Sequence, residues 1–110
     1  MTAYAVGQLE AVSVGADIVA YLERIDAMLA PFQGRFVIHG GRRHTLEGNG
    51  RGDLVVIAFP DLDSAKAWYA SPAYQAILPL RTRNATSNVY LIEGVGLDHR
   101  ATDVLKQVTG

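Results

Sequence analysis

Three polar residues in this 110-residue chain have the chemistry of proton transfer or of anion binding. His39 is the first of them, because an imidazole titrates near neutral pH and this one lies in the middle of a predicted strand, just before Gly40 and Gly41. Glu47 adds a carboxylate near the predicted end of a strand. A hydrogen-bonded histidine inside a subunit interface is the alternative interpretation of His39.

Arg81 is the third candidate, and it follows a proline at position 79. A guanidinium can hold a carboxylate or a phosphate through two parallel hydrogen bonds, so Arg81 is a candidate ligand for a substrate anion. A structural ion pair with Glu47 or Glu93 is the simpler interpretation. We therefore predict catalytic roles for His39, Arg81 and Glu47, with a structural role for each as the alternative.

Aromatic residues gather in the segment that follows the third predicted strand. Trp68, Tyr69 and Tyr74, with Tyr21 from an earlier helix, could form the wall of an apolar pocket whose hydroxyls orient a small ligand. The alternative is that these rings fill the core and anchor a subunit interface. We predict a ligand-binding role for these four side chains.

The sequence predicts neither a metal site nor a bound cofactor. The chain has no cysteine, which excludes disulfides, thiolate nucleophiles and iron–sulfur clusters. His39 and His44 are five residues apart, which places them on opposite faces of one strand. The glycines between Gly48 and Gly52 precede a strand rather than a helix, so they do not form a phosphate-binding loop.

Hydrophobic periodicity indicates the elements that must position these residues. Strands are expected over 4–11, from Gly34 to Leu46, over 54–59 and over 87–93, with a tight hairpin turn in the segment from Gly48 to Gly52. Gly40 and Gly41 within the second strand indicate a bulge or a close backbone approach. Helices are expected from Ala16 to Pro31, from Asp61 or Asp63 to Ala70, and as a short turn from Ala73 to Leu78 that begins after Ser71 and Pro72 and stops before Pro79. This order predicts an α+β fold, the ferredoxin-like βαββαβ arrangement with a four-stranded antiparallel sheet.

A further amphipathic helix is expected near the C-terminus, outside the ferredoxin-like domain of residues 3–95. Asp98 would cap this helix, and its apolar face would consist of Leu97, Ala101, Val104, Leu105 and Val108. The predicted organisation is one domain followed by a helical tail over residues 96–110.

Both faces of the predicted sheet are apolar. In the third strand Val56 and Ala58 alternate with Ile57 and Phe59, and in the fourth strand both faces are again hydrophobic. Two helices cover one face, and a large apolar patch seldom stays exposed on a monomer. We expect a homodimer through the open sheet face, and the alternative is that the C-terminal helix folds over that face.

Several short strings occur here in the order typical of one family of small bacterial proteins. They are Gly34-Arg35-Phe36, Gly40-Gly41, Leu46-Glu47-Gly48, Phe59-Pro60, the stretch from Ala67 to Gln75, Pro79-Leu80-Arg81 and Glu93-Gly94. The chain resembles the domain of unknown function 1330 over roughly residues 3–95. The resemblance implies a ferredoxin-like protomer and a dimeric α/β barrel, and it implies no function. Ala58 departs from the family, which usually has an acidic residue before Phe-Pro.

Composition excludes several classes of function. Ten basic and eleven acidic residues give a net charge of -1, which produces no general attraction to nucleic acid, and no apolar run approaches the roughly 20 residues that span a bilayer. We expect a cytoplasmic homodimer that binds a small, partly apolar molecule in a cleft between sheet and helices. It could be a cofactor-free enzyme, similar to a monooxygenase or an isomerase. The alternative is a non-catalytic small-molecule binding or regulatory module.

Overall fold

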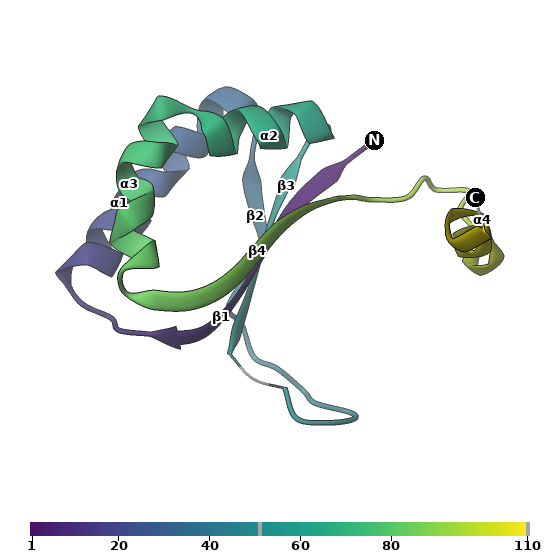
Figure 1. Cartoon of the computed structure of the whole chain (residues 1–110), viewed down its shortest axis with the longest axis horizontal. Helices are drawn as coiled ribbons and strands as arrows, with labels where there is room; N and C mark the ends of the chain where they lie inside the picture. Colours follow the sequence, from purple (N-terminus) through teal and green to yellow (C-terminus); the bar gives the residue numbers. More distant parts are fainter. Residues whose placement is uncertain (51, 110) are drawn as a thin grey trace.

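The computed structural model describes residues 1–50 and 52–109, with side chains placed up to residue 106. Its elements are β1 (Ala3–Val12), α1 (Ala16–Leu29), η1 (Ala30–Phe32), β2 (Arg35–His39), β3 (Asp53–Phe59), α2 (Leu62–Ala70), α3 (Pro72–Thr82), β4 (Ala85–Glu93), η2 (Ala101–Asp103) and α4 (Val104–Thr109). The strands form one antiparallel sheet in the order β2-β3-β1-β4. The predicted α+β, ferredoxin-like arrangement is confirmed, and within one chain the sheet is open rather than closed into a barrel (Figure 1).

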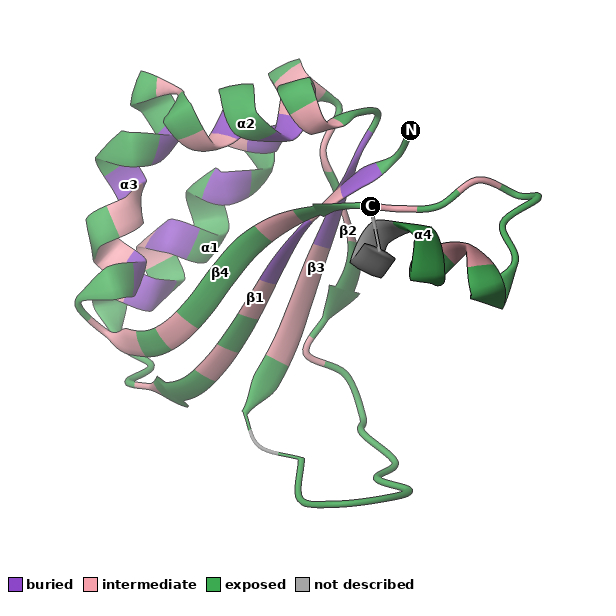
Figure 2. Cartoon of the chain, turned by 45° about the vertical axis from the view of Figure 1, so that its right-hand side comes forward, coloured by how far each residue is buried: buried purple, intermediate pink, exposed green. Residues whose placement is uncertain are grey.

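Helices α1, α2 and α3 lie on one face of this sheet (Figure 1). Strand alternation explains the core, because Ile57, Phe59 and Ala5 point towards the helices and are all nearly inaccessible to solvent. On the helices, Ile25 and Leu29 supply the matching buried positions at helical spacing. Figure 2 shows the buried residues concentrated on the facing sides of the sheet and the helices.

The opposite face of the sheet is apolar and has no cover from the described part of the chain. The antiparallel register aligns Ile38, Val56, Val6 and Tyr90 in one row across all four strands. Ile38 and Tyr90 in the edge strands remain 41% and 46% exposed. The expectation of two apolar faces is therefore met.

The C-terminal tail does not fold over the open face. It leaves the sheet after Glu93 and places α4 away from the domain body (Figure 1). Asp98 does not cap this helix, since the N-cap of η2 is Arg100, and Leu97 precedes the helical turns and is fully exposed. The expected C-terminal helix is confirmed. Leu97 does not belong to its apolar face, and the side chain of Val108 lies outside the described residues.

The predicted tight hairpin between the second and third strands is wrong. Strand β2 ends at His39, and residues 40–50 form a long irregular segment that projects from the end of the sheet (Figure 2). Gly40 and Gly41 both adopt positive φ, which stops the strand instead of forming a bulge within it. The irregularity of the β2–β3 ladder lies between Phe36 and Ile38. Residue 51 of the expected turn lies outside the described residues.

Helix α3 is longer than the sequence indicates. Ser71 caps it as expected, with its hydroxyl accepting from the Tyr74 amide, and Pro72 occupies the first turn. The helix then continues through Pro79 to Thr82, so the expected stop before Pro79 is wrong. A proline removes one backbone donor, and the tertiary contacts of this helix outweigh that loss. Arg81 consequently lies on the last turn of α3, facing the core.

Candidate functional site

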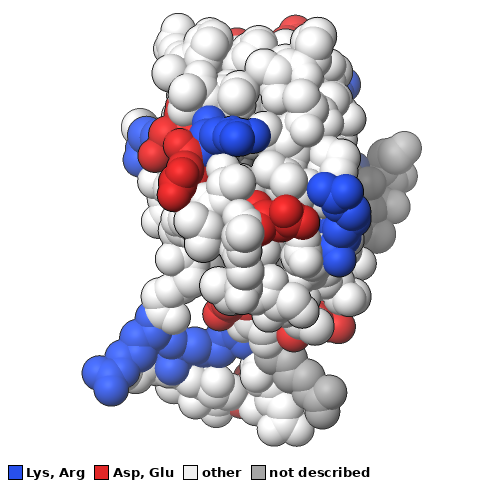
Figure 3. Space-filling model, turned by 90° about the vertical axis from the view of Figure 1, so that its left-hand side faces the viewer, with Lys and Arg blue, Asp and Glu red and all other residues white. Residues whose placement is uncertain are grey.

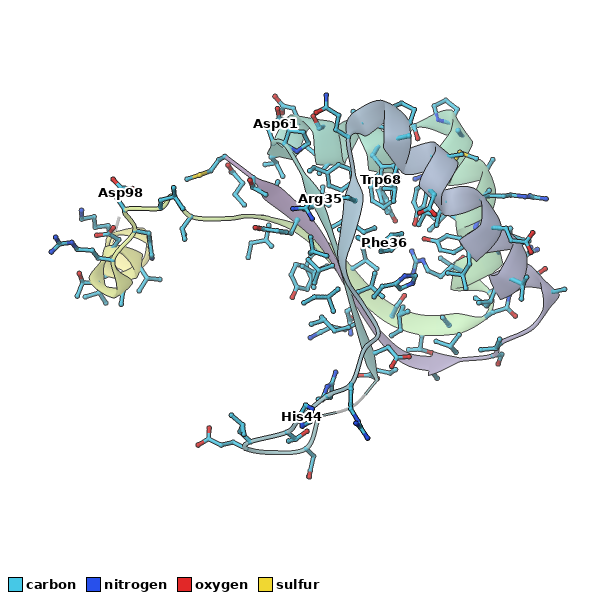
Figure 4. The ribbon with its side chains drawn as sticks, turned by 180° about the vertical axis from the view of Figure 1, so that it is seen from behind. Arg35, Phe36, His44, Asp61, Trp68 and Asp98 are labelled. Carbon is cyan, nitrogen blue, oxygen red and sulfur yellow. The ribbon has the colours of Figure 1, made fainter. Side chains whose placement is uncertain are left out.

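A small, mostly apolar cavity of about 100 Å³ lies between the sheet and the helical layer. Its floor is formed by strand residues, including Gly7 and Val55, and helices α1 and α3 supply its other walls. Figure 4 shows Phe36 and Trp68 on the helical side of the sheet, where the core side chains meet. Five of the seven predicted site residues line this cavity: Tyr21, His39, Trp68, Tyr74 and Arg81.

Two tyrosines from different helices meet at the cavity wall. Tyr21 is placed by α1, one turn from the buried Ile18 and Ile25, and Tyr74 lies in the first turn of α3 after the Ser71 cap. Their hydroxyl oxygens are 2.7 Å apart, and the rings pack edge to face with centroids 6.1 Å apart. Either hydroxyl can donate in this pair. The arrangement fixes two phenols inside the core.

Arg81 brings a positive charge to the same wall. The residue is only 8% exposed, and its guanidinium donates a hydrogen bond of 2.7 Å to the Ser87 hydroxyl on β4. In the described part of the chain, no carboxylate forms an ion pair with Arg81. The expected structural pair with Glu47 or Glu93 is therefore not formed.

Electrostatics couple Arg81 to the tyrosine pair. Burial raises the pKa of the Tyr21 hydroxyl well above its usual value, and the neighbouring Tyr74 raises it further, against a smaller lowering by Arg81. Burial lowers the pKa of the Arg81 guanidinium, but interaction with the hydroxyls of Tyr74 and Tyr21 outweighs it, so the net shift is upward. At neutral pH the site therefore holds a protonated phenol at Tyr21 and a guanidinium cation.

Trp68 closes the cavity on the side of α2. Its ring stacks at a tilt on Tyr74, with centroids 4.3 Å apart, and lies 5.3 Å from the ring of Phe59. The indole is 2% exposed, and its Nε1 has no hydrogen-bond partner among the described residues. A buried donor without an acceptor is uncommon in a folded protein.

His39 lies at the solvent-exposed end of the cavity, on the last residue of β2. Its imidazole stacks on Phe36, with ring centroids 4.2 Å apart and planes 8° from parallel. The register pairs His39 with Val55 and Phe36 with Ile57, which places both rings on the helical side. The bulge between Phe36 and Ile38 produces this placement.

The remaining two predicted residues lie elsewhere. Glu47 is exposed in the segment of residues 40–50, outside the cavity, and His44 projects in the same segment (Figure 4). Tyr69 packs against Trp68 and Tyr74 behind the cavity wall without lining it. Ala58 alternates with the core residues of β3 and so belongs to the open face, on the other side of the sheet.

Sequence reasoning missed Ser87, the residue that holds Arg81 in place, and Gly7, which leaves room in the cavity floor. Strand alternation placed Ser87 in the last strand, but nothing in the sequence linked it to an arginine six residues earlier. The described side chains contain no group of three His, Asp or Glu residues that could hold a metal ion. Within the same residues, no helix is long and apolar enough to cross a membrane.

Charged side chains of both signs are interspersed over the helical face of the molecule (Figure 3). A group of basic side chains stands apart from them at the loop end of the domain (Figure 3). This side of the molecule therefore has no single dominant charge.

The sheet, the helical layer and the cavity between them define an α+β protein of the ferredoxin-like class. A family model described as Domain of unknown function (DUF1330) matches residues 2–95, and the chain belongs to that family. No curated protein matches the chain in sequence.

Solved structures resemble the fold at low sequence identity. A dimeric ferredoxin-like protein of unknown function from a Jannaschia species has a TM-score of 0.66 and 15% identity, covering 86% of this chain and 100% of its own. A protein of unknown function from Rhodopseudomonas palustris has a TM-score of 0.64 and 13% identity, with 86% and 83% covered. A variant of SnoaB, a cofactor-independent oxygenase from Streptomyces nogalater, has a TM-score of 0.60 and 20% identity, with 89% and 98% covered. At these identities the similarity establishes the fold.

Proposed function

We propose that this protein binds a small, partly apolar molecule in the cavity between its sheet and its helices. One observation supports the proposal above others: Tyr21, His39, Trp68, Tyr74 and Arg81 come from α1, β2, α2 and α3 and line the same cavity. Convergence of a few polar groups in an apolar concavity is what small-molecule sites have in common. Core packing alone requires neither the buried guanidinium nor the tyrosine pair.

The volume of the cavity limits the size of the ligand. About 100 Å³ is well below the roughly 300–1,000 Å³ of pockets for drug-sized ligands. An apolar cavity of about 150 Å³ is known to hold a benzene ring. A ligand of about one ring, or one end of a longer molecule that leaves past His39, is the size we propose.

We propose further that two copies of the chain pair through the open sheet face. The apolar row of Ile38, Val56, Val6 and Tyr90 crosses the whole sheet, and its two outer members, Ile38 and Tyr90, are exposed to solvent. Burial of such a face against a second copy is favourable at about 25 cal/mol for each Å² removed from water. Structural neighbours described as dimeric add support. A cytoplasmic location is part of the proposal, because a chain without cysteine suits a reducing compartment.

A reaction on the bound molecule would use His39 for proton transfer, since an imidazole at the exposed end of the cavity can exchange protons with solvent. The cofactor-independent oxygenase among the structural neighbours supports this enzymatic form of the proposal at the level of fold. A binding module without catalysis is the second candidate. It is favoured by one observation: no hydrogen bond among the described residues orients the His39 imidazole.

The test uses a panel of small aromatic and alicyclic compounds, acidic and neutral, with mass spectrometry to follow conversion. Trp68 is the single tryptophan of the chain, so its fluorescence reports binding at the cavity directly. Binding with conversion that is lost in His39→Ala supports an enzyme. Saturable binding without conversion supports the module, and failure of the whole panel to change Trp68 fluorescence contradicts the proposed site.

A further inference from the structure

We propose that the cavity selects a small carboxylate attached to an apolar ring or branched chain, and that Arg81 binds its carboxylate group. This inference rests on the proposed small-molecule site and specifies the charge and the functional group of the ligand. It is carried by the arrangement of Arg81, Tyr21, Tyr74 and Ser87 around an apolar space.

The charge of Arg81 has no counter-ion in the described structure. Removing a cation from water is costly unless an anion and hydrogen bonds replace the water. Arg81 is 8% exposed, and no Asp or Glu is among the residues that line the cavity beside it. A ligand carboxylate would supply the missing negative charge at the place where the chain provides none.

The hydrogen-bond donors at the polar end of the cavity also favour a carboxylate ligand. A guanidinium has five N–H donors; one of those of Arg81 reaches the Ser87 hydroxyl, and the group also interacts with the hydroxyls of Tyr74 and Tyr21, none of which carries a negative charge. In the pair of Tyr21 and Tyr74, one hydroxyl donates to the other, which leaves the proton of the second hydroxyl in need of an acceptor. The polar end of the cavity is thus rich in donors, and a carboxylate accepts several hydrogen bonds at its two oxygens.

Ser87 is a positioning residue in this site. Its hydroxyl, on β4, fixes one nitrogen of the guanidinium at 2.7 Å, so the fork of Arg81 is held in one orientation before a ligand arrives. Arginine is suited to this role because its planar fork matches the geometry of a carboxylate in two parallel bonds.

The rest of the cavity requires an apolar group on the same ligand. The lining beyond the polar end is aliphatic and aromatic, with Ile25, Val55, Ile57 and the Trp68 ring among its members. An inorganic anion would leave these side chains without contact. The ligand class is therefore a monocarboxylate with a hydrophobic part of about one ring.

The experiment compares three ligands of one shape and different charge: benzoate, benzamide and benzylammonium. Trp68 fluorescence is titrated with each, at constant ionic strength and neutral pH. We expect saturable binding of benzoate, binding of benzamide weaker by about tenfold or more because the amide has no negative charge and only one acceptor oxygen, and no binding of the cation.

Arg81→Met should lower the affinity for benzoate by about tenfold or more and the affinity for benzamide by less, because the neutral amide loses a hydrogen bond but no ion pair. Arg83→Met is the matched control, because that neighbouring side chain is 65% exposed and lies outside the cavity, and it should leave all three affinities unchanged. Ser87→Ala keeps the charge and tests the orientation of Arg81 if Arg81→Met does not fold. It should weaken benzoate binding by a few-fold and benzamide binding by less.

Equal binding of benzoate and benzamide, in the native protein, would overturn the carboxylate inference and leave the small-molecule site intact. An unchanged benzoate affinity in both Arg81→Met and Ser87→Ala would do the same. Absence of binding by all three compounds would overturn the inference together with the proposed site.

Discussion

The hydroxyl oxygens of Tyr21 and Tyr74 lie 2.7 Å apart in the protein interior, although 53 residues separate them in the chain. The contact joins α1 to α3 through two side chains that are at most 8% exposed. It therefore links the stability of the helical layer to the polar end of the cavity.

Removal of either hydroxyl should destabilise the fold. Tyr21→Phe and Tyr74→Phe should each lower the free energy of unfolding by about 1 kcal/mol, because each leaves a buried hydroxyl without its partner. The double variant should be more stable than the sum of the two losses implies. Urea denaturation of the four proteins measures this coupling, and additivity within about 0.5 kcal/mol would contradict the paired arrangement.

Gly34, between η1 and β2, has no space for a side chain. A Cβ there would lie 2.7 Å from Cε1 of Phe59 and 2.9 Å from Cδ2 of Leu29, two core residues that are each 2% exposed. Gly34→Ala should therefore lower the free energy of unfolding by about 1–3 kcal/mol, measured by urea denaturation.

Gly7 on β1 is the control for this substitution. A Cβ at Gly7 meets nothing closer than 3.9 Å, and it would occupy part of the cavity floor. Gly7→Ala should preserve stability or raise it by about 0.4–1 kcal/mol, while weakening any ligand in the cavity. Equal losses of stability in the two variants would contradict the packing described for Gly34.

Asp61 should make the stability of the protein depend on pH in the acid range. A hydrogen bond from the Ser64 amide, 2.7 Å long, holds the pKa of the Asp61 carboxyl below its usual value. A group whose pKa is lowered on folding stabilises the fold above its unfolded pKa, and this contribution is lost as pH falls through the folded pKa. The carboxylate should thus favour the folded state at neutral pH.

Asp61→Asn removes the ionisable carboxyl and keeps a helix-capping side chain, since asparagine also caps helices and does not titrate. We expect the melting temperature of the native protein to fall more steeply than that of Asp61→Asn between neutral pH and about pH 3. Parallel melting curves across that range would show that the capping carboxylate contributes no pH dependence.

The open sheet face should decide the oligomeric state. Tyr90→Arg places a charge at the β4 end of the apolar row and should convert a dimer into a monomer, as measured by light scattering. Val19→Arg, on a helix position that is 46% exposed on the other side of the molecule, should leave the dimer intact. A native protein that is monomeric at micromolar concentration would contradict this use of the face.

The sequence predicted the βαββαβ order because its signals are local: periodicity in α1, alternation in β3, and the Asp61 and Ser71 caps. It failed where backbone conformation depends on tertiary contacts. Pro79 looked like a stop signal, yet packing of Tyr74, Ile77 and Arg81 carries the helix past it. Gly40 and Gly41 were expected within a strand and instead end it.

For the candidate site, side-chain chemistry identified most of the residues that line the cavity, but the sequence could not predict where each residue lies in the fold. Aromatic and arginine side chains could be singled out by their chemistry, and five of seven line one cavity. Glu47 could not be placed correctly, because its location depended on a hairpin that the structure replaces with an irregular loop. Ser87 could not be found, because a contact between α3 and β4 is a property of the packed layers.

One layer of backbone separates the cavity from the open face. Ile57 and Val55 point towards the cavity, and Val56, between them, points to the side where a second copy would lie. A molecule in the cavity and a neighbouring protein would thus rest on alternate residues of the same strand. His39 belongs to β2, and Ser87, which accepts a hydrogen bond from Arg81, belongs to β4. These are the two outermost strands, so the twist of the sheet sets the distance between the two ends of the site. A change in the twist of the sheet would therefore connect ligand binding in the cavity with the pairing of two chains through the open face.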